Sequence, residues 1–208
     1  MMEVLRKSVA AGCAISIGAT VYLVSENKVA GALLFTVGLF VICSFGMNLF
    51  TGKIGYVLDN KNHPNCLVIW LGNLLGCIVG SGLVRLAKPN LHTAAAELLS
   101  AKLALNWYSV LILGFFCGML MYAAVENFRA SPHGFGKVIG LFLCVSVFIL
   151  CGFEHSIADM CYCVFGVSDL SELPQIILFL LMVSAANSMG AIVLRLATKD
   201  KTEAVSQK

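Results

Sequence analysis

The chain has 208 residues, of which 59% are hydrophobic and only 12% are charged. Soluble domains carry about 25% charged residues, so this composition excludes an ordinary globular protein and indicates a single integral membrane domain spanning residues 1–208. The formal net charge of +3 is small, and no basic stretch with interleaved aromatic residues suits nucleic acid, so no nucleic-acid partner is expected.

Six apolar segments are long enough to cross the roughly 30 Å of bilayer hydrocarbon as helices. In chain order they cover approximately residues 8–24, 29–58, 66–86, 104–125, 136–165 and 173–197. The second and fifth are too long for one simple span, and they contain interruptions at 44–52 and 151–156. Because non-helical backbone is tolerated at membrane depth only where protein buries it or water reaches it, both interruptions predict broken helices around an internal site.

The two interruptions occupy corresponding places in two halves of the chain. Asn73 and Gly76 follow the first interruption in an N-x-x-G pattern, and Asn187 and Gly190 repeat it 114 residues later. Three helices per half is an odd number, so the halves must run in opposite directions through the membrane. The sequence therefore predicts an inverted 3+3 repeat of about 1–103 and 104–208, with a central permeation site.

Lysine and arginine positions predict the orientation in a cell membrane, because cytoplasmic loops carry the excess of these residues. Ten lie on one side: Arg6, Lys7, Lys53, Lys61, Arg129, Lys137, Arg195, Lys199, Lys201 and Lys208. Four lie on the other: Lys28, Arg85, Lys88 and Lys102. This asymmetry places both termini in the cytoplasm, as an even number of spans requires.

One cluster of polar residues interrupts the apolar segment 138–164. It contains Glu154, His155 and Asp159. A charge at the bilayer centre costs roughly 3 kcal/mol on insertion scales, so ionisable groups there usually face a cavity or a pathway. The cluster is therefore the first candidate for a functional site.

The sequence gives little indication of metal binding, cofactor binding or catalysis. The nine cysteines fall in or beside apolar segments without a C-x-x-C pair, and we interpret them as packing residues rather than metal ligands. No phosphate-binding glycine loop and no second polar cluster suited to catalysis occurs within the apolar segments. We therefore expect neither a metal nor a cofactor, and we expect a protein that is not an enzyme.

Three motifs carry a family resemblance: NLFTG at 48–52, GNLLG at 72–76 and GFEHSIA at 152–158. They resemble the second-helix loop, the third helix and the fifth-helix signature of the formate/nitrite transporter family. The resemblance implies an all-α membrane protein of six transmembrane helices with an aquaporin-like protomer. It also implies a homopentamer in membrane lipid that conducts small monovalent anions such as formate, nitrite or hydrosulfide.

The resemblance assigns roles residue by residue. His155 matches the central pore histidine, Thr51 the loop threonine facing it, and Lys102 a lysine of the outer vestibule. Glu154 matches the acidic residue that helps hold the broken helix. Leu39 and Leu49 match the apolar constriction on the cytoplasmic side, with Phe50 beside it, and Phe35 and Phe148 match the outer constriction. Structural roles are expected for Asn48, Asn73, Asn187 and Asp159.

Several alternatives stay open at this point. His155 is either a proton relay, for which its ordinary pKa near 6.5 suits it, or a hydrogen-bonding hub. Lys102 either gathers anions or is an interfacial lysine, and Glu154 either caps free backbone N–H groups or contacts substrate. Asp159 and Gly118 stand where the family commonly has asparagine, which leaves the choice of anion open. An aquaporin-like pore for neutral solutes is the alternative function, although no N-P-A motif occurs.

Overall fold

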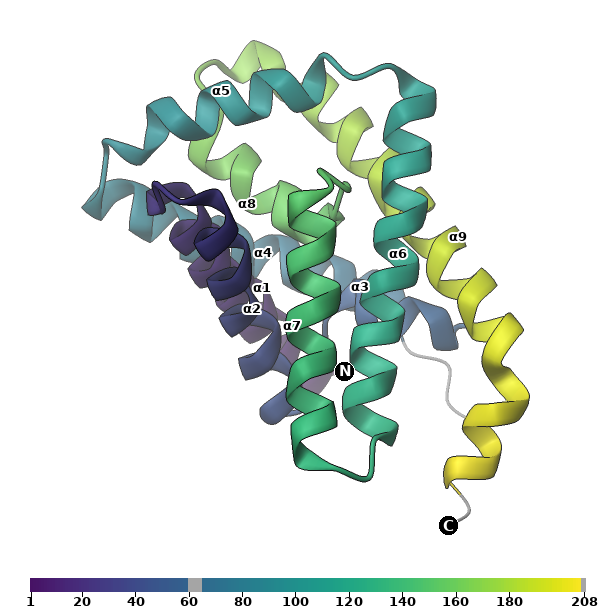
Figure 1. Cartoon of the computed structure of the whole chain (residues 1–208). Helices are drawn as coiled ribbons and strands as arrows, with labels where there is room; N and C mark the ends of the chain where they lie inside the picture. The colour runs from purple at the N-terminus through teal and green to yellow at the C-terminus, as the bar shows by residue number, and fades with distance from the viewer. Residues whose placement is uncertain (60–64, 207–208) are drawn as a thin grey trace.

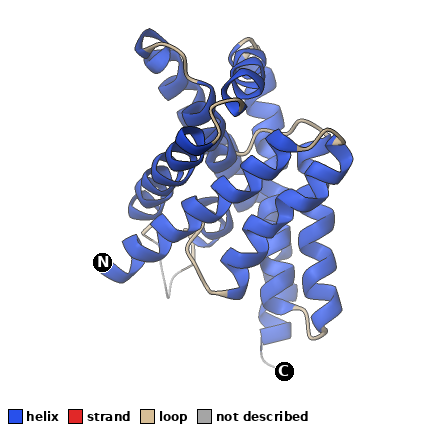
Figure 2. Ribbon diagram, turned by 90° about the vertical axis from the view of Figure 1, so that its left-hand side faces the viewer, coloured by secondary structure: helices blue, strands red, loops and turns tan. Residues whose placement is uncertain are grey.

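The computed structural model describes residues 1–59 and 65–206, with side chains described up to Thr198. Every regular element among these residues is a helix (Figure 2). The elements are α1 (Met2–Val24), α2 (Lys28–Ser44), α3 (Phe50–Lys53), η1 (Ile54–Tyr56), α4 (Cys66–Ala87), α5 (Leu91–Leu103), α6 (Trp107–Ala130), α7 (Gly134–Leu150), α8 (Ser156–Gly166), η2 (Leu170–Glu172) and α9 (Leu173–Ser206).

Four helical segments are long and apolar enough to cross a membrane. They are Met2–Val24, Cys66–Ala87, Trp107–Ala130 and Leu170–Thr198, which coincide with the expected spans near 8–24, 66–86, 104–125 and 173–197. The other apolar helices are shorter, namely Lys28–Ser44, Gly134–Leu150 and Ser156–Gly166. The overlong segment 29–58 of the sequence contains α2, α3 and η1, and the overlong segment 136–165 contains α7 and α8.

Helix α5 is an element that the hydropathy pattern does not predict. Its buried residues Leu91, Ala95 and Leu99 are spaced by four, as one helix face requires, but the helix has only 13 residues and a polar outer face. In Figure 1 it crosses the upper edge of the molecule, opposite the α6–α7 turn and the C-terminus. Of the basic residues that predict the orientation, Lys61 and Lys208 lie outside the described residues, as do the side chains of Lys199 and Lys201.

The two helix interruptions have the same backbone geometry. α2 and α7 both end in a glycine with positive φ, Gly46 at +60° and Gly152 at +65°. The following amide N–H groups, of Met47 and Phe153, donate to carbonyls five residues back, at 2.9 Å in both cases. This is the hydrogen bonding of a Schellman C-cap, which stops the helix and turns the chain inward.

Helix α1 packs along α4, and α6 packs along α9, through glycines that allow close backbone contact. A Cβ atom added to Gly12 would lie 2.2 Å from the carbonyl oxygen of Asn73, and one added to Gly118 would lie 2.0 Å from that of Asn187. Gly76 and Gly190 make the reciprocal contacts with α1 and α6. Small residues at such crossings let two helix backbones approach within membranes, and here they bring α4 and α9 against the interruptions.

Substitution of Gly190 by alanine is expected to destabilise the protein by about 1–3 kcal/mol or more, because the new methyl group would lie 1.9 Å from the backbone oxygen of Phe115. The matched control is Gly82→Ala in α4, where nothing lies within 4 Å of the added atom. Thermal unfolding of both variants in detergent measures the difference. Equal midpoints for the two variants would contradict the close α6–α9 contact.

Candidate functional site

The site is centred on His155, the residue that precedes α8. Its side chain is 1% exposed. The ring atom Nδ1 accepts a hydrogen bond from the backbone N–H of Ala158 at 3.0 Å, so His155 caps the start of α8. Because an amide N–H only donates, Nδ1 carries no proton in this arrangement, and the proton of the neutral ring lies on Nε2.

The other ring nitrogen of His155 contacts the first interruption. Nε2 lies 2.8 Å from the hydroxyl oxygen of Thr51, which is fully buried in α3. With its proton on Nε2, the ring donates and the hydroxyl oxygen accepts. One buried hydrogen bond therefore joins the starts of α3 and α8, which lie 104 residues apart in the chain.

Asn73 of α4 holds the first interruption in place. Its carbonyl oxygen accepts from the N–H of Phe50 at 2.8 Å, and its amide nitrogen donates to the carbonyl oxygens of Asn48 at 2.9 Å and Ser8 at 2.8 Å. The side chain is fully buried. The oxygen and the nitrogen of the amide group thus both form hydrogen bonds with backbone atoms that lack a partner where the helix is interrupted.

Asn187 of α9 does the same at the second interruption. Its carbonyl oxygen accepts from the N–H of Ser156 at 2.9 Å, and its amide nitrogen donates to the carbonyl oxygens of Glu154 and Gly114, both at 2.8 Å. Three hydrogen bonds from one buried side chain again join an interruption to two long helices. For Asn48, whose role was expected to be structural, the contact is made by its backbone carbonyl.

Apolar side chains surround the histidine on both sides. The rings of Phe35 and Phe148 meet edge to face with centroids 6.0 Å apart, and Phe148 stacks on His155 at 5.4 Å. Leu39 and Leu49 are 1% and 2% exposed. Phe50 is likewise buried, at the first turn of α3. All five predicted apolar residues are therefore buried; Phe148 contacts His155, and Leu49 and Phe50 directly precede Thr51 in the chain.

Lys102 is buried rather than exposed at a vestibule mouth. It lies near the end of α5, its side chain is 13% exposed, and its ammonium group contacts both the Glu154 carboxylate and Asp159 Oδ1, the latter at 2.9 Å. The reading of Lys102 as an interfacial lysine is therefore wrong. The Glu154 carboxylate is paired with Lys102, whereas the N–H groups at the start of α8 are bound by Asn187 and His155.

Two cavities lie on different sides of the Thr51–His155 bond. A small one of about 70 Å³ is lined by His155, Phe148, Lys102, Asp159 and Tyr162, among others. A larger one of about 320 Å³ lies near the α6–α7 turn, where Leu49 and Gly52 face Lys53, Arg129 and Lys137. Three basic residues line the larger cavity, which favours the approach of an anion there, whereas in the wall of the small cavity Lys102 is paired with carboxylates.

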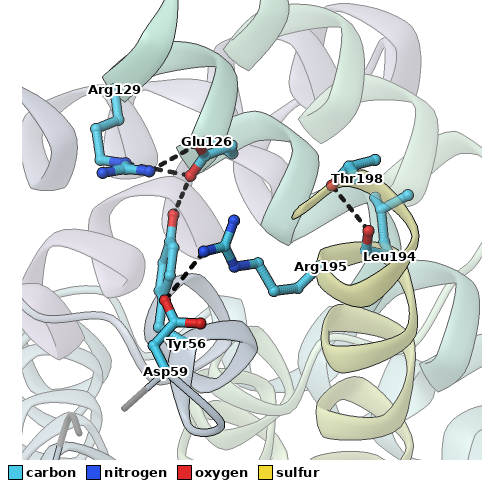
Figure 3. A network of polar contacts seen from close by, with 7 residues as sticks. All are labelled: Tyr56, Asp59, Glu126, Arg129, Leu194, Arg195 and Thr198. Carbon is cyan, nitrogen blue, oxygen red and sulfur yellow. Dashed lines mark hydrogen bonds and ion pairs between the residues drawn. The ribbon is translucent and has the colours of Figure 1, made fainter. Parts of the chain in front are cut away.

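A polar network beside the larger cavity was not foreseen from the sequence. Glu126 accepts hydrogen bonds from the Tyr56 hydroxyl and from Arg129, whose Nη2 lies 2.8 Å from Oε1 (Figure 3). Arg195 of α9 contacts Asp59 at 3.1 Å. Tyr56 lies in η1, which follows α3, and Asp59 lies three residues later. The network therefore attaches the chain segment that follows Thr51 to α6 and α9. Its partners are separated by 70 and 136 residues, and no local pattern pairs them.

Gly118 faces the backbone of Asn187, and any side chain there would meet α9. Close packing of α6 on α9 therefore requires its glycine. Within the described part of the chain, no group of three His, Cys, Asp or Glu side chains is placed to bind a metal ion.

The family model for formate/nitrite transporters matches residues 1–198. The chain belongs to the formate/nitrite transporter family. Its fold is also that of two solved channels. One, described as an FNT family ion channel, has a TM-score of 0.81 at 24% identity, covering 92% of this chain and 86% of that one. The other, a pentameric formate channel with formate bound, has a TM-score of 0.79 at 22% identity, covering 100% and 98%.

Curated proteins are similar to the chain at 24–31% sequence identity. The transporter YwcJ of Bacillus subtilis is 31% identical over 172 residues, which are 70% of this chain and 61% of that protein. The formate channel FocA of Haemophilus influenzae is 24% identical over 148 residues, 64% of this chain and 52% of that protein. The chain thus spans about half to three-fifths of the length of these relatives. Membership of this transporter family, together with several apolar helices, identifies a multi-pass membrane protein and fits the expectation that the chain is not an enzyme.

Substitution of Asn187 by alanine is expected to lower the stability of the protein strongly. It leaves the N–H of Ser156 and two carbonyl oxygens without their partner, and each buried unpaired group costs about 1–3 kcal/mol. Asn106→Ala is the matched control, because that exposed side chain donates to the hydroxyl of the exposed Tyr108. Thermal unfolding and size-exclusion profiles in detergent compare the two. A fully stable Asn187 variant would argue against its clamping role.

Proposed function

We propose that the chain forms a pore for small monovalent anions of the formate, nitrite or hydrosulfide class, with His155 and Thr51 at its centre. The observation that carries the proposal is the buried Thr51–His155 hydrogen bond, which in this proposal closes a path between the small cavity lined by His155 and the larger cavity lined by Leu49 and basic residues. The name of the formate-bound channel and those of the curated formate channels support the substrate class.

We also infer that residues 1–103 and 104–208 form an inverted repeat of three spans each, within one membrane domain and around an aquaporin-like pore. The hydrogen bonds at the two interruptions support this, because they correspond pair by pair. Asn73 bridges the Asn48 carbonyl and the Phe50 N–H, and Asn187 bridges the Glu154 carbonyl and the Ser156 N–H. Each bridged atom of the second pair lies 106 residues after its counterpart in the first.

In this pore the constrictions would lie on either side of the central histidine. Phe148 lines the small cavity on the α5 side, and Leu49 lines the larger cavity near the α6–α7 turn. We therefore assign Phe35 and Phe148 to the outer constriction and Leu39 and Leu49, with Phe50 beside them, to the cytoplasmic one. In this orientation both termini and the α6–α7 turn face the cytoplasm of a cell that carries the protein in its cell membrane.

Moving an anion through an apolar constriction is costly unless its charge is compensated or removed. A weak acid avoids the cost when it crosses as the neutral molecule, which motivates proton coupling in the pore. The hydrogen bond from the ring N–H of His155 to Thr51 would be exchanged for one to the substrate as it passes. His155 thus provides a donor in a region where the surrounding side chains are apolar.

A pore for small neutral solutes is the second candidate. The observation that favours it is the pairing of Lys102 with two carboxylates, because their charges offset the ammonium charge that would attract an anion. Uptake measurements with matched anionic and neutral solutes separate the two candidates.

Purified protein in proteoliposomes is expected to take up formate, nitrite or hydrosulfide but not glycerol, with faster uptake at acidic pH because more of each weak acid is neutral there. His155→Asn removes the ring that bonds Thr51 and is expected to lower uptake. The matched control is His133→Asn at an exposed position before α7, which should behave as the wild type.

Glycerol uptake without anion uptake would replace the anion channel by the neutral-solute pore. Uptake by the His155 variant equal to that of the wild type at every pH would remove His155 from the mechanism.

We propose further that the protein is a homopentamer in membrane lipid. One solved structure of the same fold is described as pentameric, and large apolar side chains cover the outside of the helices, for example Leu67, Leu71 and Leu75 along α4. Such side chains suit contact with lipid or with a neighbouring copy. Native mass spectrometry in mild detergent is expected to give about five times the chain mass of 22.3 kDa. A monomeric mass across several detergents would contradict the pentamer.

A further inference from the structure

Asp159 differs from the other charged groups near the histidine in one respect. Its atom Oδ1 contacts Lys102 at 2.9 Å, but its second carboxyl oxygen, Oδ2, has no hydrogen-bond partner among the described residues. The side chain is 1% exposed. A buried polar atom left unpaired costs about 1–3 kcal/mol, so Oδ2 needs a partner or a proton of its own.

The small cavity beside His155 can supply that partner. Asp159 lines this cavity together with Lys102, His155 and Tyr162, and its volume is about 70 Å³. One water needs roughly 10–15 Å³ of such volume, so the cavity has room for several waters or for one small anion. A molecule held in this cavity therefore lies beside the Asp159 side chain.

The charges around Asp159 do not balance without a proton. Glu154 and Asp159 both contact the ammonium group of Lys102, which gives a net charge of −1 when all three are ionised. The other titratable groups facing Asp159 or its cavity are Tyr22 of α1, Cys117 of α6, and His155, Tyr162 and Cys163 on its own segment. None of these is a permanent cation, and a single bound proton makes the buried cluster neutral.

His155 is less free to give up a proton to a substrate. Its Nδ1 is occupied by the Ala158 N–H, and its single ring proton is directed at Thr51. The ring thus serves as a cap and as a hydrogen-bond donor within the protein. Asp159 Oδ2, by contrast, makes neither a capping bond nor any other hydrogen bond among the described residues.

We propose that Asp159 is the proton-exchanging carboxyl group of the pore, holding a proton on Oδ2 and giving it to a weak-acid anion in the small cavity; this rests on the proposed channel function. The Oδ2–H bond breaks, an H–O or H–S bond forms on the anion, and the electron pair stays on Asp159 as carboxylate. The neutral acid crosses the apolar region. Hydronium from water on the α5 side then protonates Asp159 again, so one proton accompanies each anion.

The proposal is tested with Asp159→Asn, which keeps the shape of the side chain but holds no exchangeable proton. Proteoliposomes with an internal pH dye report the protons that arrive with each formate. The proton flux is expected to fall on the order of 100-fold, the lower end of what a positioned proton donor contributes to a rate. An unchanged number of protons per formate in this variant would overturn the proposal.

Infrared spectroscopy tests the same proton without any transport. The wild type at neutral pH is expected to show the C=O stretch of a protonated carboxyl group, and Asp159→Asn should lose this band. Asp169→Asn is the matched control at an exposed position outside the spanning helices, where the N–H of Ser171 lowers the pKa of the carboxyl and keeps it ionised. A band that persists in Asp159→Asn but disappears in Glu154→Gln would place the proton on Glu154 and overturn the proposal.

Wild-type protein alone gives a further test, in case Asp159→Asn does not fold. Nitrite, which has no carbonyl group, is expected to weaken the carboxyl band as it takes the proton, and a band that nitrite leaves unchanged would overturn the proposal. Failure of the proposed function has a different signature. In that case the wild type carries no anion into proteoliposomes, whereas the carboxyl band and its loss in Asp159→Asn are still measurable.

Discussion

Backbone that leaves the helix between two apolar segments must find hydrogen bonds within the protein, because hydrocarbon offers none. In this chain two asparagines meet that requirement. Asn73 and Asn187 each bond an N–H and a carbonyl across an interruption and a further carbonyl on a neighbouring long helix. The asparagines can reach these atoms only because α4 and α9 approach α1 and α6 at glycines, so the helix packing follows from the same constraint.

Once the interruptions are held, the starts of α3 and α8 point at each other and Thr51 meets His155. The histidine is then part of the scaffold as well as of the proposed path, since its two nitrogens bind an amide of α8 and a hydroxyl of α3. A substrate that passes must compete with the second of these bonds. The phenylalanines and leucines nearby keep water away, which strengthens every hydrogen bond made there.

The charged cluster on the α5 side distinguishes this chain from a simple anion-attracting vestibule. A lysine with two carboxylates does not present a net positive charge, so attraction of an anion depends on where protons reside in the cluster. Among the described residues around the larger cavity, Arg129 is paired with Glu126, and no ion pair joins Lys53 or Lys137 to an acidic side chain. The two ends of the proposed path therefore differ in charge although the proposed repeat would relate their backbones.

Much of the fold follows from the sequence, because hydropathy over some 20 residues is a local property and two glycines with a polar run are enough to end a helix. The motifs around Asn48, Asn73 and His155 also identify the residues of the site. The short helix α5 and the burial of Lys102 escape such reasoning, since a 13-residue helix with a polar face looks like a loop in a hydropathy pattern. Only the tertiary structure decides that Lys102 meets Glu154 and Asp159, that Gly118 faces α9, and that Arg195 reaches Asp59, because these contacts join residues 52 to 136 positions apart.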